Sequence, residues 1–298
     1  MPSVKEIKNR IASVQNTKKI TNAMYLISST KMRKAKSELD LTRPFFEAVK
    51  REMARITGSC EDLQSPFFKE KEGVCGYLVI TADKGLAGAY NQNVQKEALR
   101  LMKEDGESKL YVVGECGRHF FTSHNIPIEK SFLYTAQNPS MHRAREIADT
   151  LVDAYLSGAL AKIYIIYTDM ENAVSSRVKS AQLLPLSGEK FASEKINPAA
   201  VEFVPSVKSV IENIVPSYAA GFIYSALIDS FCSEQSARMN AMDSANRNAE
   251  KLLAELSVLY NHVRQSAITQ EITEVSSGAK SMRRKAEAKK GVHSDVKR

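Results

Sequence analysis

Residues 81–91 form the first place where the sequence could do chemistry. They read TADKGLAGAYN, follow a run of strand-forming residues and open a helical stretch. A glycine-containing turn between a strand and a helix can hold a phosphate on its backbone N–H groups. This turn lacks both the Gly-Lys-Ser/Thr of a P-loop and the Gly-x-Gly-x-x-Gly of a dinucleotide site. We therefore favour a tight structural turn, with a buried contact of Asp83 or Lys84.

A second turn, at residues 114–119, places Cys116 three residues before His119. A thiol beside an imidazole could form a nucleophile with its base. Nothing in the sequence orients the imidazole, so a turn is favoured here too. The cysteines, which are Cys60, Cys75, Cys116 and Cys232, form no Cys-x-x-Cys pair and accompany no histidine cluster. We expect free, mostly buried thiols, with no metal site and no cofactor.

Two helical stretches near the C-terminus carry hydrogen-bonding side chains. Residues 233–243 are polar around the whole helix, which is typical of a helix inside solvent or a polar sleeve. We interpret them as a surface that successive partners contact. Arg264 and Gln265 are adjacent, and Thr269 and Glu271 follow one to two turns later. A solvated charged face and a set of side chains that binds a partner loop explain these four residues equally well.

The net charge of +8 is concentrated at the two ends of the chain. Residues 1–36 hold nine Lys/Arg and one acid, and residues 282–298 hold seven Lys/Arg and two acids. Basic ends predict an acidic partner, which could be a protein, a nucleic acid or a lipid surface. The basic run at 31–36 lacks interleaved aromatics and any nucleic-acid-reading motif, so its charge alone predicts only non-specific binding.

The sequence shows no membrane span and no signal peptide. No apolar run reaches the roughly 18 residues that a span needs, and the N-terminus lacks an apolar signal core. We expect a cytosolic chain, or one on the cytosolic face of a membrane.

Long helices at both ends must position these residues. An N-terminal coiled-coil seam has three-four-three spacing, at Val4, Ile7, Ile11 and Val14. Its next positions, Lys18 and Thr21, are polar, and an apolar stripe then resumes at Ile20, Met24, Ile27, Met32, Ala35 and Leu39. The C-terminal seam comprises Leu252, Leu256, Leu259 and Val263, followed after a slip by Ile268, Ile272 and Val275. We expect Pro216 to kink or restart the C-terminal helix. From Met282 we expect a frayed helix or disorder.

The middle of the chain alternates strands and helices. Strand-like runs occupy 74–80, 109–113 and 162–167, with helical stretches at about 92–104 and 140–157 and one more strand within 178–186. This alternation favours a parallel sheet covered on both faces. The predicted fold class is therefore α/β: a long antiparallel coiled coil of the terminal helices, with a Rossmann-like α/β domain inserted between them. The expected division is 1–60 for the N-terminal helix, 61–206 for the α/β domain, 207–281 for the C-terminal helix and 282–298 for a basic tail.

Three blocks of the sequence resemble the gamma subunit of F-type ATP synthases. They are residues 7–24 with 31–35, the turn at 83–91, and residues 234–279. The two end blocks are long and specific, and the match covers nearly the whole chain. The resemblance implies a central-stalk rotor inside a ring of alpha and beta subunits. Its α/β domain would lie near the epsilon subunit and the membrane ring of c subunits.

The resemblance also implies roles for particular residues. Arg264, Gln265, Thr269 and Glu271 match positions that contact a beta-subunit loop, and Lys8, Arg10, Lys18 and Lys19 would present positive charge to beta subunits. Asp83, Lys84, Gly85 and Gly88 match a structural turn. The polar break at Lys18 and Thr21 would let that stretch slide rather than lock. The chain itself would be non-catalytic, bind no nucleic acid and no small-molecule ligand, and lie peripherally on the cytoplasmic face of the cell membrane.

Two other hypotheses compete with the rotor. One is a basic coiled-coil adaptor that binds nucleic acid or an acidic protein, and the other is a small nucleotide-binding α/β enzyme with helical arms. The chain also departs from the family pattern, because about 16 residues, strongly basic, follow Met282. Neither the role of this tail nor the coupling ion follows from the sequence.

Overall fold

The computed structural model describes residues 3–59, 65–133, 135–170, 175–187, 203–204 and 206–295. Its elements in chain order are α1 (Val4–Ser59), β1 (Cys75–Ile80), α2 (Tyr90–Asp105), β2 (Ser108–Val113), α3 (Glu115–Ser123), β3 (Lys130–Phe132), α4 (Met141–Leu156), β4 (Lys162–Met170), β5 (Ser176–Leu184) and α5 (Val207–Asp295). The chain divides into two compact units. We name Met24–Ala241 the sheet unit, and Met1–Ala23 with Met242–Arg298 the coiled-coil unit. Both α1 and α5 contribute to each unit.

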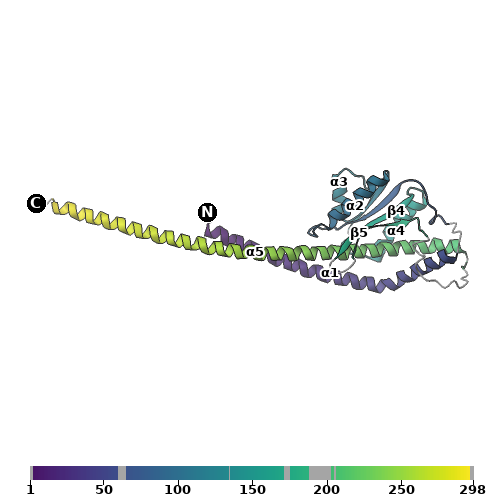
Figure 1. Cartoon of the computed structure of the whole chain (residues 1–298), viewed down its shortest axis with the longest axis horizontal. Helices are drawn as coiled ribbons and strands as arrows, with labels where there is room; N and C mark the ends of the chain where they lie inside the picture. Colours follow the sequence, from purple (N-terminus) through teal and green to yellow (C-terminus); the bar gives the residue numbers. More distant parts are fainter. Residues whose placement is uncertain are drawn as a thin grey trace. The chain divides into compact units, whose positions relative to one another are not determined.

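The sheet unit is built on five strands in the order β3-β2-β1-β4-β5. Figure 1 shows this sheet together with α2, α3 and α4. β1 pairs in parallel with β2 and β4, and β2 pairs in parallel with β3. β5 runs antiparallel to β4 along the edge. All six residues of β1 are buried, because helices cover both faces of the sheet.

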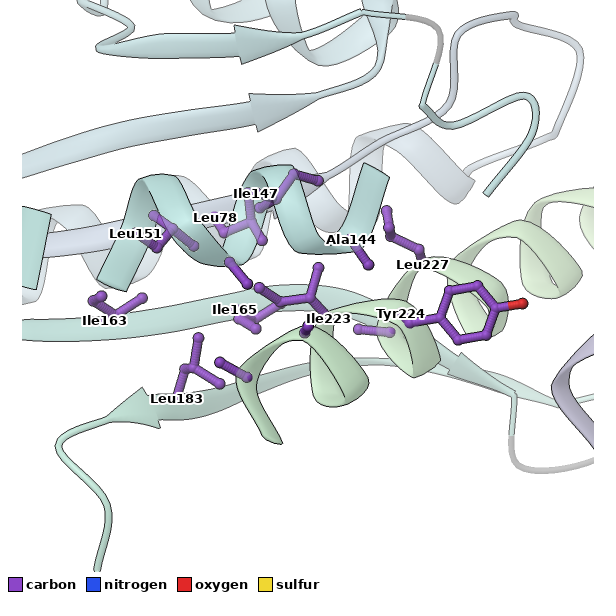
Figure 2. Packing of buried hydrophobic residues seen from close by; sticks show 14 of the residues in the cluster. Leu78, Ala144, Ile147, Leu151, Ile163, Ile165, Leu183, Ile223, Tyr224 and Leu227 are labelled. Carbon is purple, nitrogen blue, oxygen red and sulfur yellow. The ribbon is translucent and has the colours of Figure 1, made fainter. Parts of the chain in front are cut away.

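The two faces of the sheet have separate apolar cores. On one face, alternate strand residues pack with α2 and α3 through Val94, Ala98 and Phe121. On the other face, strand residues pack with α4, α5 and part of α1. Figure 2 shows this second core, to which Ile147 and Leu151 from α4, Ile223 and Leu227 from α5, and Ile163 and Ile165 from β4 contribute. Burial of each Leu or Ile side chain stabilises the fold by about 1.5–3 kcal/mol. This core therefore holds the N-terminal part of α5, from Ile211 to Cys232, on the sheet.

The coiled-coil unit pairs the start of α1 with the later part of α5. The two helices are antiparallel, because Lys18 and then Thr21 meet Glu250 and then Asn246. Ile7 and Leu256 are the buried apolar residues of the two seams. The predicted coiled coil with an inserted α/β domain is thus confirmed.

Several local expectations were wrong. α5 continues unbroken through Pro216, so the helix does not restart there, and Val215, Ala219 and Ala220 are buried against the core. A kink at Pro216 stays a prediction. Ile20 and Ile27, expected in the apolar stripe, are exposed. Ala35 of the same stripe is buried as expected, and Ser28, which was not expected there, is buried too.

Other differences concern short or terminal segments. α3 and β3 were not anticipated, and β5 is the expected extra strand with an antiparallel direction. Beyond Met282 the backbone is helical as far as Asp295, which agrees with the helical one of the two expected alternatives. α1 ends at Ser59 and α5 begins at Val207, close to the expected boundaries after residues 60 and 206. The compact units, in contrast, divide after residues 23 and 241. The division into four ranges stays a prediction.

Candidate functional site

The turn after β1 is held by polar side chains. Asp83 accepts a hydrogen bond from the backbone N–H of Glu115 (3.0 Å), and Asn91 accepts one from the N–H of Ala82 (2.9 Å). Leu86 and Gly88 adopt the left-handed backbone conformation, with φ of 63° and 56°. Glycine suits this conformation at position 88, whereas Leu86 bears its steric cost. Burial raises the pKa of Asp83, and the N–H of Glu115 acts against that shift.

Arg238 of α5 closes this turn. Its Nη2 donates to the carbonyl oxygens of Lys84 (3.1 Å) and Gly85 (3.0 Å), and its Nη1 lies 2.6 Å from a carboxylate oxygen of Glu234. Burial raises the pKa of Glu234, and the charge of Arg238 acts in the opposite direction. We name Glu234, Arg238 and the turn 82–88 the clasp. Because the turn directs carbonyl oxygens at a cation here, this geometry does not suit a phosphate cradle.

The buried positions within 233–243 are therefore not the partner surface that we expected, whereas at the exposed Asn240 and its half-buried neighbours that interpretation stays a prediction. Ser233, Glu234, Gln235 and Arg238 are buried; Glu234 and Arg238 lie on one side of α5, whereas Ser233 and Gln235 point to other sides. The helix is polar there because it packs on backbone groups at the carboxyl edge of the sheet. The i, i+4 spacing of Glu234 and Arg238 is the signal in the sequence that could have revealed the pair.

The polar positions of the α1 seam also face a partner within the chain. Lys18 Nζ lies 2.8 Å from Glu250, whose pKa it lowers, and the hydroxyl of Thr21 donates to the Asn246 side chain. The interpretation of these positions as a sliding surface is therefore wrong, because both side chains face α5. They form a polar layer between the two helices instead.

The other basic residues expected at the site are free of such pairing. Lys8, Arg10 and Lys19 are exposed, and none of them makes an ion pair in the part of the chain that the structure describes. Lys8 and Lys19 are eleven residues apart, so they point in nearly the same direction on α1. Arg10 lies on another side of the helix.

Arg264, Gln265, Thr269 and Glu271 are all exposed on α5, but they do not form one cluster. Successive helical residues point about 100° apart, which places Arg264 with Glu271 and Gln265 with Thr269. The Thr269 hydroxyl donates to the Gln265 carbonyl (2.9 Å), and the Arg264 guanidinium lies 6.0 Å from the centroid of the Tyr260 ring.

An exposed apolar stripe separates these two pairs. It consists of Ile268, Ile272 and Val275, which we name the distal stripe and which are 49%, 64% and 74% exposed. On helical geometry it lies between the Arg264 side and the Gln265 side, and it faces away from the seam of Leu252 and Leu256. An apolar centre with polar borders is the composition of a protein–protein interface.

The remaining candidates show no activated chemistry. Burial raises the pKa of the Cys116 thiol, while His119 is exposed and contacts Glu115 at 3.5 Å. Cys75 and Cys232 are buried free thiols, and Cys60 lies outside the described residues. Within the described ranges, no group of three or more His, Cys, Asp or Glu side chains could hold a metal ion.

One stretch of α5 passes a length-and-hydropathy test for a membrane span. The window is 61% buried within the protein, as is usual for a core helix of a soluble fold. By this test, applied to the described residues, α5 offers only weak support for a span.

Known proteins resemble this chain over nearly its whole length. The family described as ATP synthase matches residues 3–282. An ATP synthase gamma chain of Ruminiclostridium cellulolyticum is 38% identical over 94% of this chain and 99% of its own length. Another, from Caldanaerobacter subterraneus subsp. tengcongensis, is 40% identical over 92% and 98%.

Solved structures show the same fold. A chain in the central stalk and c-ring structure of Tetrahymena thermophila mitochondrial ATP synthase aligns with a TM-score of 0.57 at 27% identity, covering 76% of this chain and 99% of that one. A chain of the Euglena gracilis mitochondrial ATP synthase, in its OSCP/F1/c-ring structure, aligns at 0.66 with 16% identity and 94% coverage of both. The chain therefore belongs to the ATP synthase gamma-chain family and is the central-stalk rotor subunit of a membrane-bound ATP synthase.

Proposed function

We propose that this rotor is non-catalytic and that it acts through the distal stripe and its polar borders, which contact the alpha and beta subunits. The observation that carries the proposal is the exposure of Ile268, Ile272 and Val275 at helical spacing. Exposed apolar side chains in register on one helix indicate a surface that a partner covers. If each conformation of a partner subunit binds the rotor best at a different angle, rotation favours these conformations in turn. The affinity of that subunit for nucleotide would then change with the angle of the rotor.

The polar borders give this contact its specificity. Arg264 and Glu271 on one side, and Gln265 and Thr269 on the other, can hydrogen-bond a beta-subunit loop that lies across the stripe. Lys8, Arg10 and Lys19 add exposed positive charge to the same unit, which suits acidic partner surfaces. Lys18 contributes less to a partner, because Glu250 already pairs with its ammonium group.

The proposal also assigns partners to the sheet unit. The sheet unit would meet the epsilon subunit and the c-ring on the cytoplasmic face of the membrane. The chain itself would bind no nucleotide, since the turn after β1 directs the carbonyls of Lys84 and Gly85 at Arg238. ATP binding and hydrolysis would then belong to the surrounding subunits.

Coexpression with the alpha and beta subunits of the same organism tests this function. We expect the chain to copurify with them at physiological salt, and calorimetric titration of the chain with ATP to show no tight binding. Copurification that Ile272→Asp abolishes, but that Val258→Asp leaves intact, would locate the contact on the distal stripe. Val258 is a suitable control because it is an equally exposed apolar residue of the same helix.

An acidic protein is favoured over nucleic acid as the partner because the distal stripe is apolar. Nucleic-acid binding driven by Lys and Arg alone falls steeply with added salt. Loss of the alpha and beta subunits, together with salt-sensitive retention of nucleic acid, would contradict the rotor and support the adaptor.

A further inference from the structure

The carboxyl edge of the sheet has an unusual occupant. The chain runs from β1 outward to β2 and β3 and then returns to β4 on the other side of β1. In open α/β sheets, ligands bind in the crevice where the strand order reverses in this way. Here α5 lies at that position. The Ser230 hydroxyl accepts from the N–H of Thr168 (3.2 Å), and the Ser233 hydroxyl donates to the Thr168 carbonyl (3.3 Å).

The attachment of α5 changes character along the helix. From Ile211 to Cys232 it is apolar and belongs to the core shared with α4 and the strands. After Cys232 the attachment consists of the Ser233 hydrogen bond to Thr168, of Ala237, which packs on Ala82, Ala87 and Tyr90, and of the clasp. The clasp is thus the last directional attachment that the described residues give α5 before the sheet unit ends at Ala241.

We propose that the clasp is the torque-bearing joint that fixes the rotational position of α5 against the α/β domain. The apolar core holds α5 on the sheet, but each apolar contact is non-directional, whereas hydrogen bonds depend on the orientation of their donors and acceptors. A guanidinium has a rigid planar set of donors, and here it is held by Glu234 and by two backbone carbonyls at once. Turning α5 by one residue would point Arg238 about 100° away and break its two hydrogen bonds to the carbonyls of Lys84 and Gly85. Glu234 is on the same helix and would turn together with Arg238.

Burial makes the joint stiff. The side chains of Arg238 and Glu234 are 9% and 7% exposed, so water cannot readily replace the broken hydrogen bonds. A buried ion pair adds little net stability, because removing its charges from water costs about as much as their attraction gains. We therefore assign this pair a different role, which is to fix one orientation of α5 relative to the turn. In a rotor, that arrangement is the angle at which the domain passes torque to the shaft.

The proposal rests on the chain's role as rotor but on none of the proposed contacts with particular subunits. The test uses the assembled synthase in sealed membrane vesicles, comparing Arg238→Met, Arg238→Lys and Glu234→Gln. The control is Arg247→Met, which removes an exposed i, i+4 ion pair with Asp243 from the same helix. In each preparation we measure ATP hydrolysis with and without an ionophore, together with ATP-driven ion pumping.

We expect Arg238→Met to hydrolyse ATP as the wild type does when the ionophore removes the ion gradient. Against the gradient, its pumping per ATP is expected to fall several-fold, because the joint slips only under load. Arg238→Lys keeps the charge beside Glu234 but lacks the planar set of donors, so we expect an intermediate loss. Arg247→Met is expected to match the wild type under both conditions.

Hydrogen exchange in the assembled complex gives a second readout. In Arg238→Met we expect amide exchange at residues 82–88 to accelerate about tenfold, which corresponds to about 1.4 kcal/mol of local protection. Wild-type pumping per ATP in Arg238→Met would overturn the proposal, even if exchange at the turn increases. If Arg238→Met fails to assemble, Arg238→Lys decides by the same ratio. Failure of the wild-type chain to copurify with alpha and beta subunits would instead contradict the proposed function.

Discussion

α5 carries two ion pairs of the same type and spacing that differ in almost everything else. Glu234–Arg238 in the sheet unit and Asp243–Arg247 in the coiled-coil unit are both i, i+4 pairs, with N–O separations of 2.6 and 2.8 Å. The first pair is 7% and 9% exposed, and the second is 46% and 75% exposed. Surroundings, rather than the local pattern, therefore decide what an ion pair does in this helix.

The physical difference is the cost of leaving a charge without its partner. In water, either member of the exposed pair is solvated when the other is removed, so little changes. In the sheet unit, loss of Arg238 leaves a buried carboxylate beside Asp83 and Tyr90, as well as two carbonyls without a donor. The buried pair thus holds the structure by penalising its own disruption.

The largest expected effect follows from breaking the buried pair. Arg238→Met is expected to lower the free energy of unfolding of the full chain by about 3–5 kcal/mol, because Glu234 becomes an unpaired buried charge. Urea denaturation followed by circular dichroism measures this change. Arg247→Met is the matched control, and an equal effect of the two substitutions would remove the distinction between the pairs.

A third carboxylate of α5 sharpens the comparison. Asp229 is largely buried but makes no ion pair within 4 Å in the described part of the chain. Burial raises its pKa from 3.8 to about 6, with a smaller contribution from Asp169, while the charges of Arg43, Lys179 and Lys36 act against the shift. Its ionised form is therefore less stable in the folded chain than in the unfolded one.

Asp229→Asn is accordingly expected to stabilise the chain at pH 7, by up to about 3 kcal/mol. The folded state binds the proton more tightly, so the wild type loses stability as the pH rises from about 4 to about 6 and not beyond. Urea midpoints measured across this range test the sign. A wild type that gains stability over the same interval, relative to Asp229→Asn, would contradict the assignment.

The polar layer between α1 and α5 is expected to respond more weakly. Lys18 and Glu250 are 38% and 60% exposed, so solvent screens their attraction. Lys18→Met is expected to produce a small loss of stability at low salt that disappears at high salt, where exposed charges are screened. Thermal melting at two ionic strengths measures it, and a salt-independent loss would show that the layer acts as a buried pair.

Long periodic segments were the part of the fold that the sequence could predict. The apolar runs of β1, β2 and β4 and the seams of α1 and α5 each repeat over enough residues to be recognised. α3 and β3 have only nine and three residues, too few for a period to emerge. The restart of α5 expected at Pro216 does not occur. Proline disfavours a helix only locally, and the packing of Val215 and Ala219 in the core outweighs this preference.

Part of the candidate site could also be predicted from the sequence, and part could not. Exposed residues such as Arg264 and Gln265 could be proposed from resemblance and spacing, but their placement on two borders of one stripe needs helical geometry. The clasp was missed for a different reason. Glu234 and Arg238 look like a solvated pair in the sequence, and their burial depends on a turn about 150 residues away.

The smallest expected effect on stability is at a polar border of the distal stripe, where the effect on function is expected to be large. Arg264 is exposed and contacts only the Tyr260 ring of its own helix among the interactions described, so Arg264→Ala is expected to leave the unfolding midpoint of the chain unchanged. In the assembled synthase the same substitution is expected to weaken ATP-driven ion pumping or assembly. Lys109→Ala in β2 is the control, because it also removes a cation, one that is half-buried and lies 3.5 Å from Glu129. Comparable pumping by the two variants would count against the contact, whereas a lowered unfolding midpoint in Arg264→Ala would place this residue with the clasp as a structural group.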